Sequence, residues 1–194
     1  VLTSAGRLGV NDSSPQGVLH VTSDSTTVDA LYIESNEDSS SAAPVVTLHR
    51  HSASPADADY LGQLKFKGEN DADQEVVYAK ITAKIQDASD GTEDGLIEFA
   101  NRKAGSNAIT ARLRSDSLQL LNDTSLALKS DGAQLQFGND NDMQIYHNGS
   151  NGEINNATGN FTIDSAGEIT LDADGAVIRL KDGGTEFGKI SQNS

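Results

Sequence analysis

Apolar residues recur in regularly spaced pairs between residues 117 and 181. The two members of each pair are separated by one residue, and successive pairs begin 8 or 9 residues apart. Asn, Asp, Gly and Ser fill the intervals, so each pair places two side chains on one face of a short strand. Such a fixed spacing identifies an internal repeat. The eight members, of which only the one at Gly152 breaks the apolar rule, are Leu118/Leu120, Leu126/Leu128, Leu135/Phe137, Met143/Ile145, Gly152/Ile154, Phe161/Ile163, Ile169/Leu171 and Ile178/Leu180.

A repeat this short cannot bury enough apolar surface within one chain to offset the conformational entropy lost on folding. Stacked repeats cover part of the apolar stripe, and other copies of the chain can cover the rest while they pair the open strand edges. We therefore predict that residues 116–194 form a repeat region of intertwined short strands. These strands would belong to a parallel homotrimeric fibre with a region similar to a triple-stranded β-helix.

Longer strands are predicted between residues 44 and 115. In the longest, apolar residues occupy the odd positions from 77 to 85, and mostly polar residues occupy the even positions from 78 to 84. This alternation predicts one dry and one wet face, which is typical of an antiparallel sheet that covers a core. We predict an antiparallel β module over residues 44–115, with strands at residues 45–51, 61–67, 75–86, 96–101 and 109–114.

Residues 1–43 are predicted to form an N-terminal β stem and linker. Two short alternating segments, at residues 8–10 and 19–21, are separated by Gly and Pro and predict a hairpin. Residues 30–33 predict a further strand, and the Ser-, Asn- and acid-rich residues 34–43 predict a loop or linker. Together the three regions predict an all-β, elongated homotrimeric fibre.

The composition favours a thin core and excludes several classes. Apolar residues make up only 36% of the 194 residues, and 18 Gly accompany many turn-forming residues. The formal net charge is −15, or 3 × −15 = −45 in a trimer, and the 14 Lys and Arg are scattered, which argues against binding of nucleic acid. The sequence has no Cys and no apolar run as long as a membrane span, so we expect neither disulfides nor membrane insertion.

Three stretches carry motifs that can be compared with a known family: Gly6-Arg7-Leu8-Gly9-Val10, Gly62-Gln63-Leu64-Lys65-Phe66-Lys67-Gly68 and Met143-Gln144-Ile145-Tyr146-His147-Asn148-Gly149-Ser150. The first two resemble modules of tail fibres and similar appendages of tailed bacteriophages. The third resembles a segment of structural proteins from phages of marine cyanobacteria. The family usually has Gly-Thr at Asn11-Asp12, and it more often has Asp at position 148.

The resemblance implies a trimeric virion appendage that mediates or supports attachment to the host cell surface. Its implied partners are other virion tail or capsid proteins and a host surface glycan or protein, and its implied location is the extracellular virion surface. Two alternatives stay open. One is a purely structural stem or adaptor that carries a separate adhesin, and the other is a glycan depolymerase domain.

Three acidic clusters could carry chemistry but are better interpreted as turns. Glu93 and Asp94, with Asp90 nearby, could form a glycan-cleaving carboxylate pair, yet flanking Gly residues favour a solvated hairpin turn. Residues 139–142 and 172–175 offer oxygen ligands for calcium but lack the ligand spacing of an EF-hand, so turns are again favoured. We therefore expect no catalytic residues, no bound cofactor and no enzymatic activity.

His49 and His51 are the candidate metal ligands. Strand alternation places both imidazoles on one face, about 7 Å apart along the chain. If that face met a threefold axis, three chains would bring six imidazoles together, which suits octahedral coordination of a transition metal. The resemblance adds a precedent, since some phage tail fibres use alternating histidines in this way. The alternative is that Val46 and Leu48 face the core and both histidines are exposed to solvent.

Overall fold

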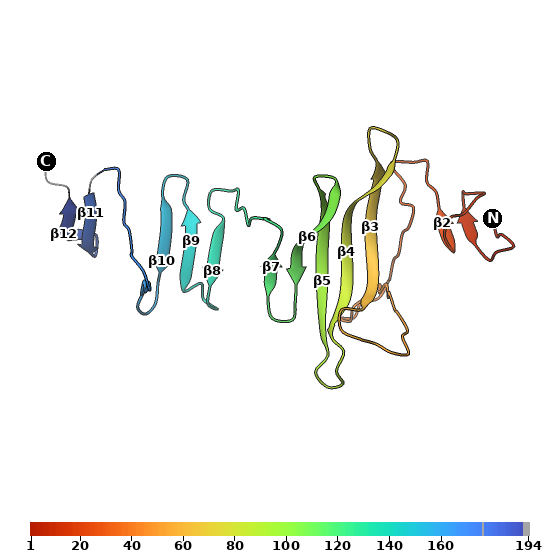
Figure 1. Cartoon of the computed structure of the whole chain (residues 1–194), viewed down its shortest axis with the longest axis horizontal. Helices are drawn as coiled ribbons and strands as arrows, with labels where there is room; N and C mark the ends of the chain where they lie inside the picture. The colour runs from red at the N-terminus through yellow and green to blue at the C-terminus, as the bar shows by residue number, and fades with distance from the viewer. Residues whose placement is uncertain (176, 192–194) are drawn as a thin grey trace. The chain divides into compact units, whose positions relative to one another are not determined.

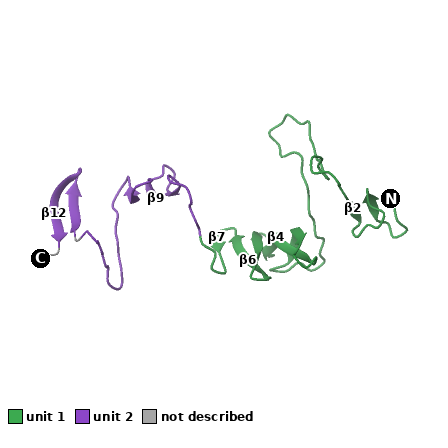
Figure 2. Cartoon of the chain, turned by 90° about the horizontal axis from the view of Figure 1, so that it is seen from above, with its two compact units in different colours: residues 1–125 green, residues 126–194 purple. Residues whose placement is uncertain are grey.

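The structure, a computed structural model, describes residues 1–175 and 177–191 (Figure 1). The prediction of an all-β fold is confirmed, with 0% helix and 41% strand. The described residues form twelve strands in four sheets, and within them no helix is long and apolar enough to cross a membrane. The chain divides into two compact units, Val1–Ser125 and Leu126–Ser194, which are green and purple in Figure 2.

The first sheet pairs β1 (Leu8–Val10) with β2 (Leu19–Val21). Both strands lie where the alternation predicts them, but they are parallel, so the predicted hairpin is wrong. Residues 11–18 return the chain to the starting end of β1, as a parallel pair requires. Within this connection, the backbone N–H of Ser14 donates to the carboxylate of Asp12 at 2.6 Å.

Two predicted strands are absent, because residues 30–33 and 45–51 form no hydrogen-bonded strand. Residues 30–33 have the alternating pattern of a strand, but a strand also needs a neighbouring strand to pair with, and the pattern does not show whether one is present. In the second segment, the Leu48 side chain lies against the sheet at Gly62. A Cβ atom on Gly62 would lie 3.1 Å from both Cβ and Cδ1 of Leu48, so Leu48 occupies the space that a side chain at Gly62 would fill. Residues 34–43 contain no strand, which agrees with the predicted loop.

An antiparallel five-stranded sheet dominates unit 1, with the strands in sequence order across it (Figure 1). Four of the five strands predicted for the middle of the chain are confirmed, each with slightly different ends. The fifth strand of the sheet is the first member of the predicted repeat, so the sheet extends past residue 115. The strands are β3 (Tyr60–Glu69), β4 (Glu75–Asp87), β5 (Asp94–Lys103), β6 (Ser106–Leu113) and β7 (Leu118–Leu120).

Unit 2 holds two smaller antiparallel sheets. Five of the eight predicted pairs lie in strands, counting the one in β7, whereas the pairs that begin at Leu126, Phe161 and Ile169 lie outside strands. The end of the predicted repeat region, residues 192–194, lies outside the described residues. One sheet has the order β10-β9-β8 and the other is a hairpin; the strands are β8 (Gln134–Phe137), β9 (Met143–His147), β10 (Gly152–Asn156), β11 (Val177–Asp182) and β12 (Thr185–Ser191).

Turn residues join the strands of unit 2 where the sequence predicts them. The β9–β10 hairpin turns at Asn148-Gly149, where the Asn148 side-chain oxygen accepts hydrogen bonds from the N–H groups of Ser150 and Asn151. Gly149 has a φ of +91°, which strongly favours Gly. The Asn-Gly signal therefore reflects both a local side-chain bond and a backbone conformation that Gly adopts easily.

Candidate functional site

The five-stranded sheet has one apolar face that its own chain leaves largely uncovered. Two adjacent rows of side chains cross the strands in register on this face. Ala100, 5% exposed, is the one buried hydrophobic residue in the described chain, and it does not belong to these rows. Ile81 in the centre is half-buried, whereas six large side chains of the two rows remain 39% to 66% exposed: Leu64, Phe99, Leu120, Ile97, Leu113 and Leu118.

The opposite face of the same sheet is polar and better protected. One row across all five strands consists of polar side chains, and its members include Thr82, 3% exposed, and Glu98, 5% exposed. Gln63 donates a hydrogen bond to the Thr82 hydroxyl at 3.2 Å. Arg112 donates from Nε and Nη2 to Oε1 of Glu98, at 3.1 and 2.7 Å. The buried polar groups of this row therefore have partners within one chain, as buried polar groups require.

The positions of Thr82 and Glu98 correct the predicted wet face. Sequence alternation assigned Thr82 to a wet face and the apolar rows to a dry one, but in a single chain Thr82 is buried and most large side chains of the apolar rows are exposed. Gln63, opposite Thr82 on the neighbouring strand, donates a hydrogen bond to its hydroxyl group. Glu98 and Arg112 alternate with apolar residues in the sequence, and this alternation indicates which face of its own strand each residue occupies. It does not show that the two residues lie opposite each other on neighbouring strands.

The three-stranded sheet of unit 2 repeats this asymmetry. Leu135, Ile145 and Ile154 lie opposite one another across β8, β9 and β10. Ile145 is 36% exposed and Ile154 is 60% exposed. On the other face, Tyr146 donates a hydrogen bond to Glu153 at 2.8 Å. This bond, more than burial, raises the pKa of the Tyr146 phenol.

The total surface left in contact with water is large for a chain of this mass. The structure exposes 15577 Å², whereas a compact monomer of 20.4 kDa exposes roughly 8,800 Å². Obligate subunit interfaces bury about 2,000 to 5,000 Å² or more and resemble a core cut in half. The excess is therefore of the size that subunit association can cover.

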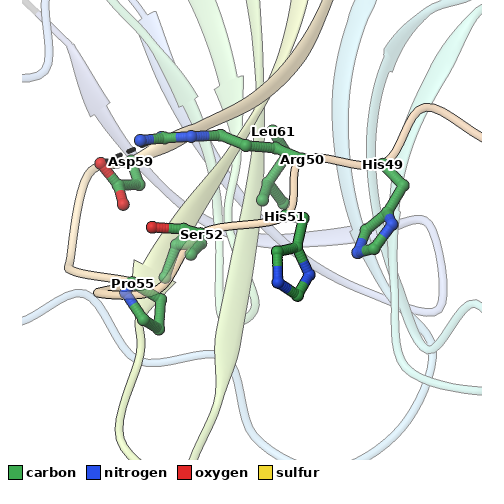
Figure 3. A pocket seen from close by; sticks show the side chains of 8 residues that line it. His49, Arg50, His51, Ser52, Pro55, Asp59 and Leu61 are labelled. Carbon is green, nitrogen blue, oxygen red and sulfur yellow. Dashed lines mark ion pairs between the residues drawn. The ribbon is translucent and has the colours of Figure 1, made fainter.

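His49 and His51 lie beside a pocket of about 160 Å³ near the start of β3. Their rings hang from the same side of the chain (Figure 3), with centroids 6.2 Å apart and ring planes at 79°. Both residues are exposed, and they are not part of a hydrogen-bonded strand. Within the described residues of one chain, no third His, Cys, Asp or Glu joins them in a group that could hold a metal ion.

Arg50, between the two histidines, extends to the pocket wall instead. Its guanidinium forms an ion pair with Asp59 at 3.1 Å and donates to the Tyr60 carbonyl oxygen at 3.1 Å (Figure 3). The Asp59 carboxylate also accepts a hydrogen bond from the N–H of Ala56 at 3.2 Å. The Ala56 bond and then the Arg50 guanidinium lower the pKa of Asp59. These contacts fix the segment that carries the histidines against the edge of the sheet.

The acidic residues near Glu93 lie at the β4–β5 turn, which confirms the hairpin turn. Glu93 and Asp94 both line a pocket of about 420 Å³, together with Asp87. Asp87 accepts a hydrogen bond from the N–H of Ser89 at 2.8 Å, and this bond lowers the pKa of its carboxyl. A general acid for glycoside cleavage needs a raised pKa, so Asp87 is unsuited to that role.

The two possible calcium clusters are also turns. Residues 139–142 connect β8 and β9, and the N–H of Asn141 donates to the carbonyl oxygen of Gly138 at 3.3 Å. Residues 174 and 175 form a turn ahead of β11. The interpretation as turns is confirmed for both clusters, and neither belongs to a metal-binding group in the described part of the chain.

Comparison of the sequence with protein-family models and with curated proteins, and of the structure with solved structures, finds no match.

Proposed function

We propose that this chain is a subunit of a homotrimeric, tail fibre-like virion appendage that mediates or supports attachment to the host cell surface. The resemblance of three sequence stretches to tailed-phage proteins supports the virion assignment. One structural observation supports the assembly: the sheet of unit 1 pairs Thr82, Glu98 and Arg112 within one chain but leaves two apolar rows largely uncovered.

Association of identical chains is the direct way to cover these rows. Each copy contributes the same apolar face, and three such faces can close around a threefold axis with the polar faces outward. The sheet of unit 2 has an apolar face of the same kind, so the trimer contact and the predicted β-helix-like packing can continue through the repeat region. Two copies could also form a sandwich, and the number three follows from the resemblance to phage appendages.

Adjacent residues on β7 provide a matched test of the assembly. Leu118 belongs to the apolar face and is 66% exposed in one chain, whereas Gln119 belongs to the polar row. The wild-type chain should have the mass of three copies by native mass spectrometry. Leu118→Asp should abolish this species, because it places three carboxylates in the shared core, whereas Gln119→Asp should retain it. A folded wild-type monomer at micromolar concentration, or equal assembly of both variants, would contradict the trimer.

The place on the virion and the role in attachment need a separate experiment. An antibody against this chain should label an appendage of intact virions in electron micrographs, and its Fab fragments should slow adsorption to host cells. Labelling without an effect on adsorption would favour the structural stem or adaptor. Absence of the label from virions would refute the proposal.

The histidine pair remains a proposed metal site within this assembly. His49 and His51 lie next to Leu48, which contacts the sheet at Gly62, so six imidazoles could approach one another if the segment meets the threefold axis. Elemental analysis of dialysed trimer should then find about one transition metal ion per trimer, lost in His49→Ala. Metal-free trimer with full thermal stability would end this part of the proposal.

A further inference from the structure

The polar face of the five-stranded sheet is basic, although the chain is strongly acidic. Three adjacent registers on this face contain four cationic side chains, and the single acidic residue among them is Glu98. The net charge of the three registers is therefore 4 − 1 = +3, against −15 for the whole chain. The acidic residues of this module gather instead at its turns, and the four cations are Lys65, Lys80, Lys84 and Arg112.

Two of these lysines lie opposite each other, and no acidic group in the described part of the chain balances their positive charges. Lys65 lies directly opposite Lys80 on neighbouring strands, and like charges in this position destabilise a sheet. Neither ammonium group forms an ion pair or hydrogen bond with another described residue. In contrast, Lys67 pairs with Glu75 at 2.7 Å on the same two strands. The arrangement of Lys65 and Lys80 does not serve the stability of the sheet, so an anion from outside the chain is the natural partner.

The surroundings of the lysines suit a sugar polymer. Lys84 lies over the ring of Tyr60, with Nζ 4.7 Å from the ring centroid, and the Tyr60 residue is 52% exposed. Gln63 and Gln119 add amide groups that can donate and accept hydrogen bonds. Lys80 and Lys84 are four residues apart on β4, about 13 Å along the strand, so the cations spread over several sugar units. A broad, flat face with spaced cations, amides and an exposed aromatic ring fits an acidic glycan.

The distribution of charge also argues against nucleic acid as the ligand of this face. Nucleic acid carries closely spaced phosphates and requires dense clusters of Lys and Arg. Here the acidic β3–β4 and β4–β5 turns lie at the ends of the basic strands, so a continuous phosphate backbone would meet repulsion along its path. A polysaccharide also carries uncharged, hydroxyl-bearing ring surface along its chain, which the glutamine amides and the Tyr60 ring of this face can contact between the lysines.

We propose that the polar face of the β3–β7 sheet binds a carboxylate-bearing polysaccharide of the host surface. This inference rests on the proposed function, because the polar face points outward only if the apolar faces meet within the trimer. Three equivalent faces on one particle would then act together, and their combined affinity for a long polymer would exceed that of one face.

The test uses trimer whose mass has been verified and polygalacturonate as the acidic probe, with neutral dextran and single-stranded DNA as comparisons. The variant Lys65→Gln/Lys80→Gln/Lys84→Gln removes the cations of the face. The variant Lys129→Gln/Lys181→Gln/Lys189→Gln makes the same change of charge in unit 2, where all three lysines are exposed. Affinity is measured by calorimetry, and thermal unfolding of each variant is followed in parallel.

Wild-type trimer should bind polygalacturonate, more weakly as salt rises, and should bind dextran and DNA poorly. The polar-face variant should lose about tenfold or more in affinity, while the unit 2 variant should bind as the wild type does. The melting temperature of the polar-face variant should be equal or higher, since the repulsion between Lys65 and Lys80 is gone. A purely structural role of these lysines predicts the opposite change in melting temperature.

Three results would overturn the inference: no binding of polygalacturonate by wild-type trimer, equal loss in both variants, or tighter binding of DNA than of the polyuronate. Each of these results can be distinguished from a failure of the proposed function. If the trimer forms and the antibody labels virions while polygalacturonate does not bind, the ligand assignment alone fails. If no trimer forms, the proposed function fails first.

Discussion

The two faces of the five-stranded sheet differ in how their side chains find partners. On the polar face, Arg112 reaches Glu98 and Gln63 reaches Thr82 across neighbouring strands, so hydrogen bonds within one chain satisfy these two buried side chains. On the apolar face, the neighbouring strands contribute only further apolar side chains in the same layer, and these cannot cover one another. A single flat layer cannot bury both of its own faces. The central polar row thus finds its partners within one chain, and the apolar face requires a second surface.

We expect the largest effect on assembly from a charge on the apolar face of the three-stranded sheet in unit 2. Leu135→Asp places a charge on the apolar face of the β8–β10 sheet, opposite Ile145. If that face is shared among three chains, the variant should fail to assemble into soluble trimers, as measured by sedimentation equilibrium. Asp140→Ala, in the turn between β8 and β9, is the control and should assemble normally. Equal thermal stability of the two variants would refute the inward position of Leu135.

An intermediate effect is expected on the polar face. Arg112→Met keeps the length of the side chain but removes the donors that satisfy Glu98, whose side chain is 6% exposed. The free energy of unfolding should fall by about 2 to 3 kcal/mol in urea titrations, because a nearly buried carboxylate loses its charged partner. The double variant with Glu98→Leu should recover most of this loss. An additive effect of the two substitutions would show that the pair is not coupled.

The smallest effect concerns the two carboxyls with lowered pKa values at the edge of the sheet. Asp59 and Asp87 each have a pKa below the ordinary value of 3.8 in the folded state, because backbone N–H groups donate to them. Their contribution to stability is therefore complete above about pH 3.8 and is lost as the pH falls through the lowered folded pKa. The urea midpoint should decrease in that range.

Asp59→Asn should reduce this dependence, because it removes one of the two titrating groups. The comparison of wild type and variant at pH 7 and below pH 3.8 isolates the contribution of Asp59 from that of the other carboxyls. If the difference between the two proteins does not change with pH, Asp59 does not contribute through its ionisation.

The sequence by itself determined the class of fold and most of the strands in the middle of the chain. Alternation located β3 to β6 because a half-exposed strand must repeat with period two, and Asn-Gly and Asp-Gly located the turns because of their backbone preferences. The acidic turns near Glu93 and Asn139 were recognised as turns for the same local reason. These features depend on neighbours along the chain, which the sequence lists directly.

Only the tertiary structure decided the features that depend on register and on pairing partners. It made β1 and β2 parallel, it left residues 30–33 and 45–51 without a strand, and it joined β7 to the five-stranded sheet. It also aligned Gln63, Thr82, Glu98 and Arg112 in one row and placed Lys65 opposite Lys80. A shift of one residue in register would have separated every one of these pairs, and alternation within a strand does not fix the register between strands.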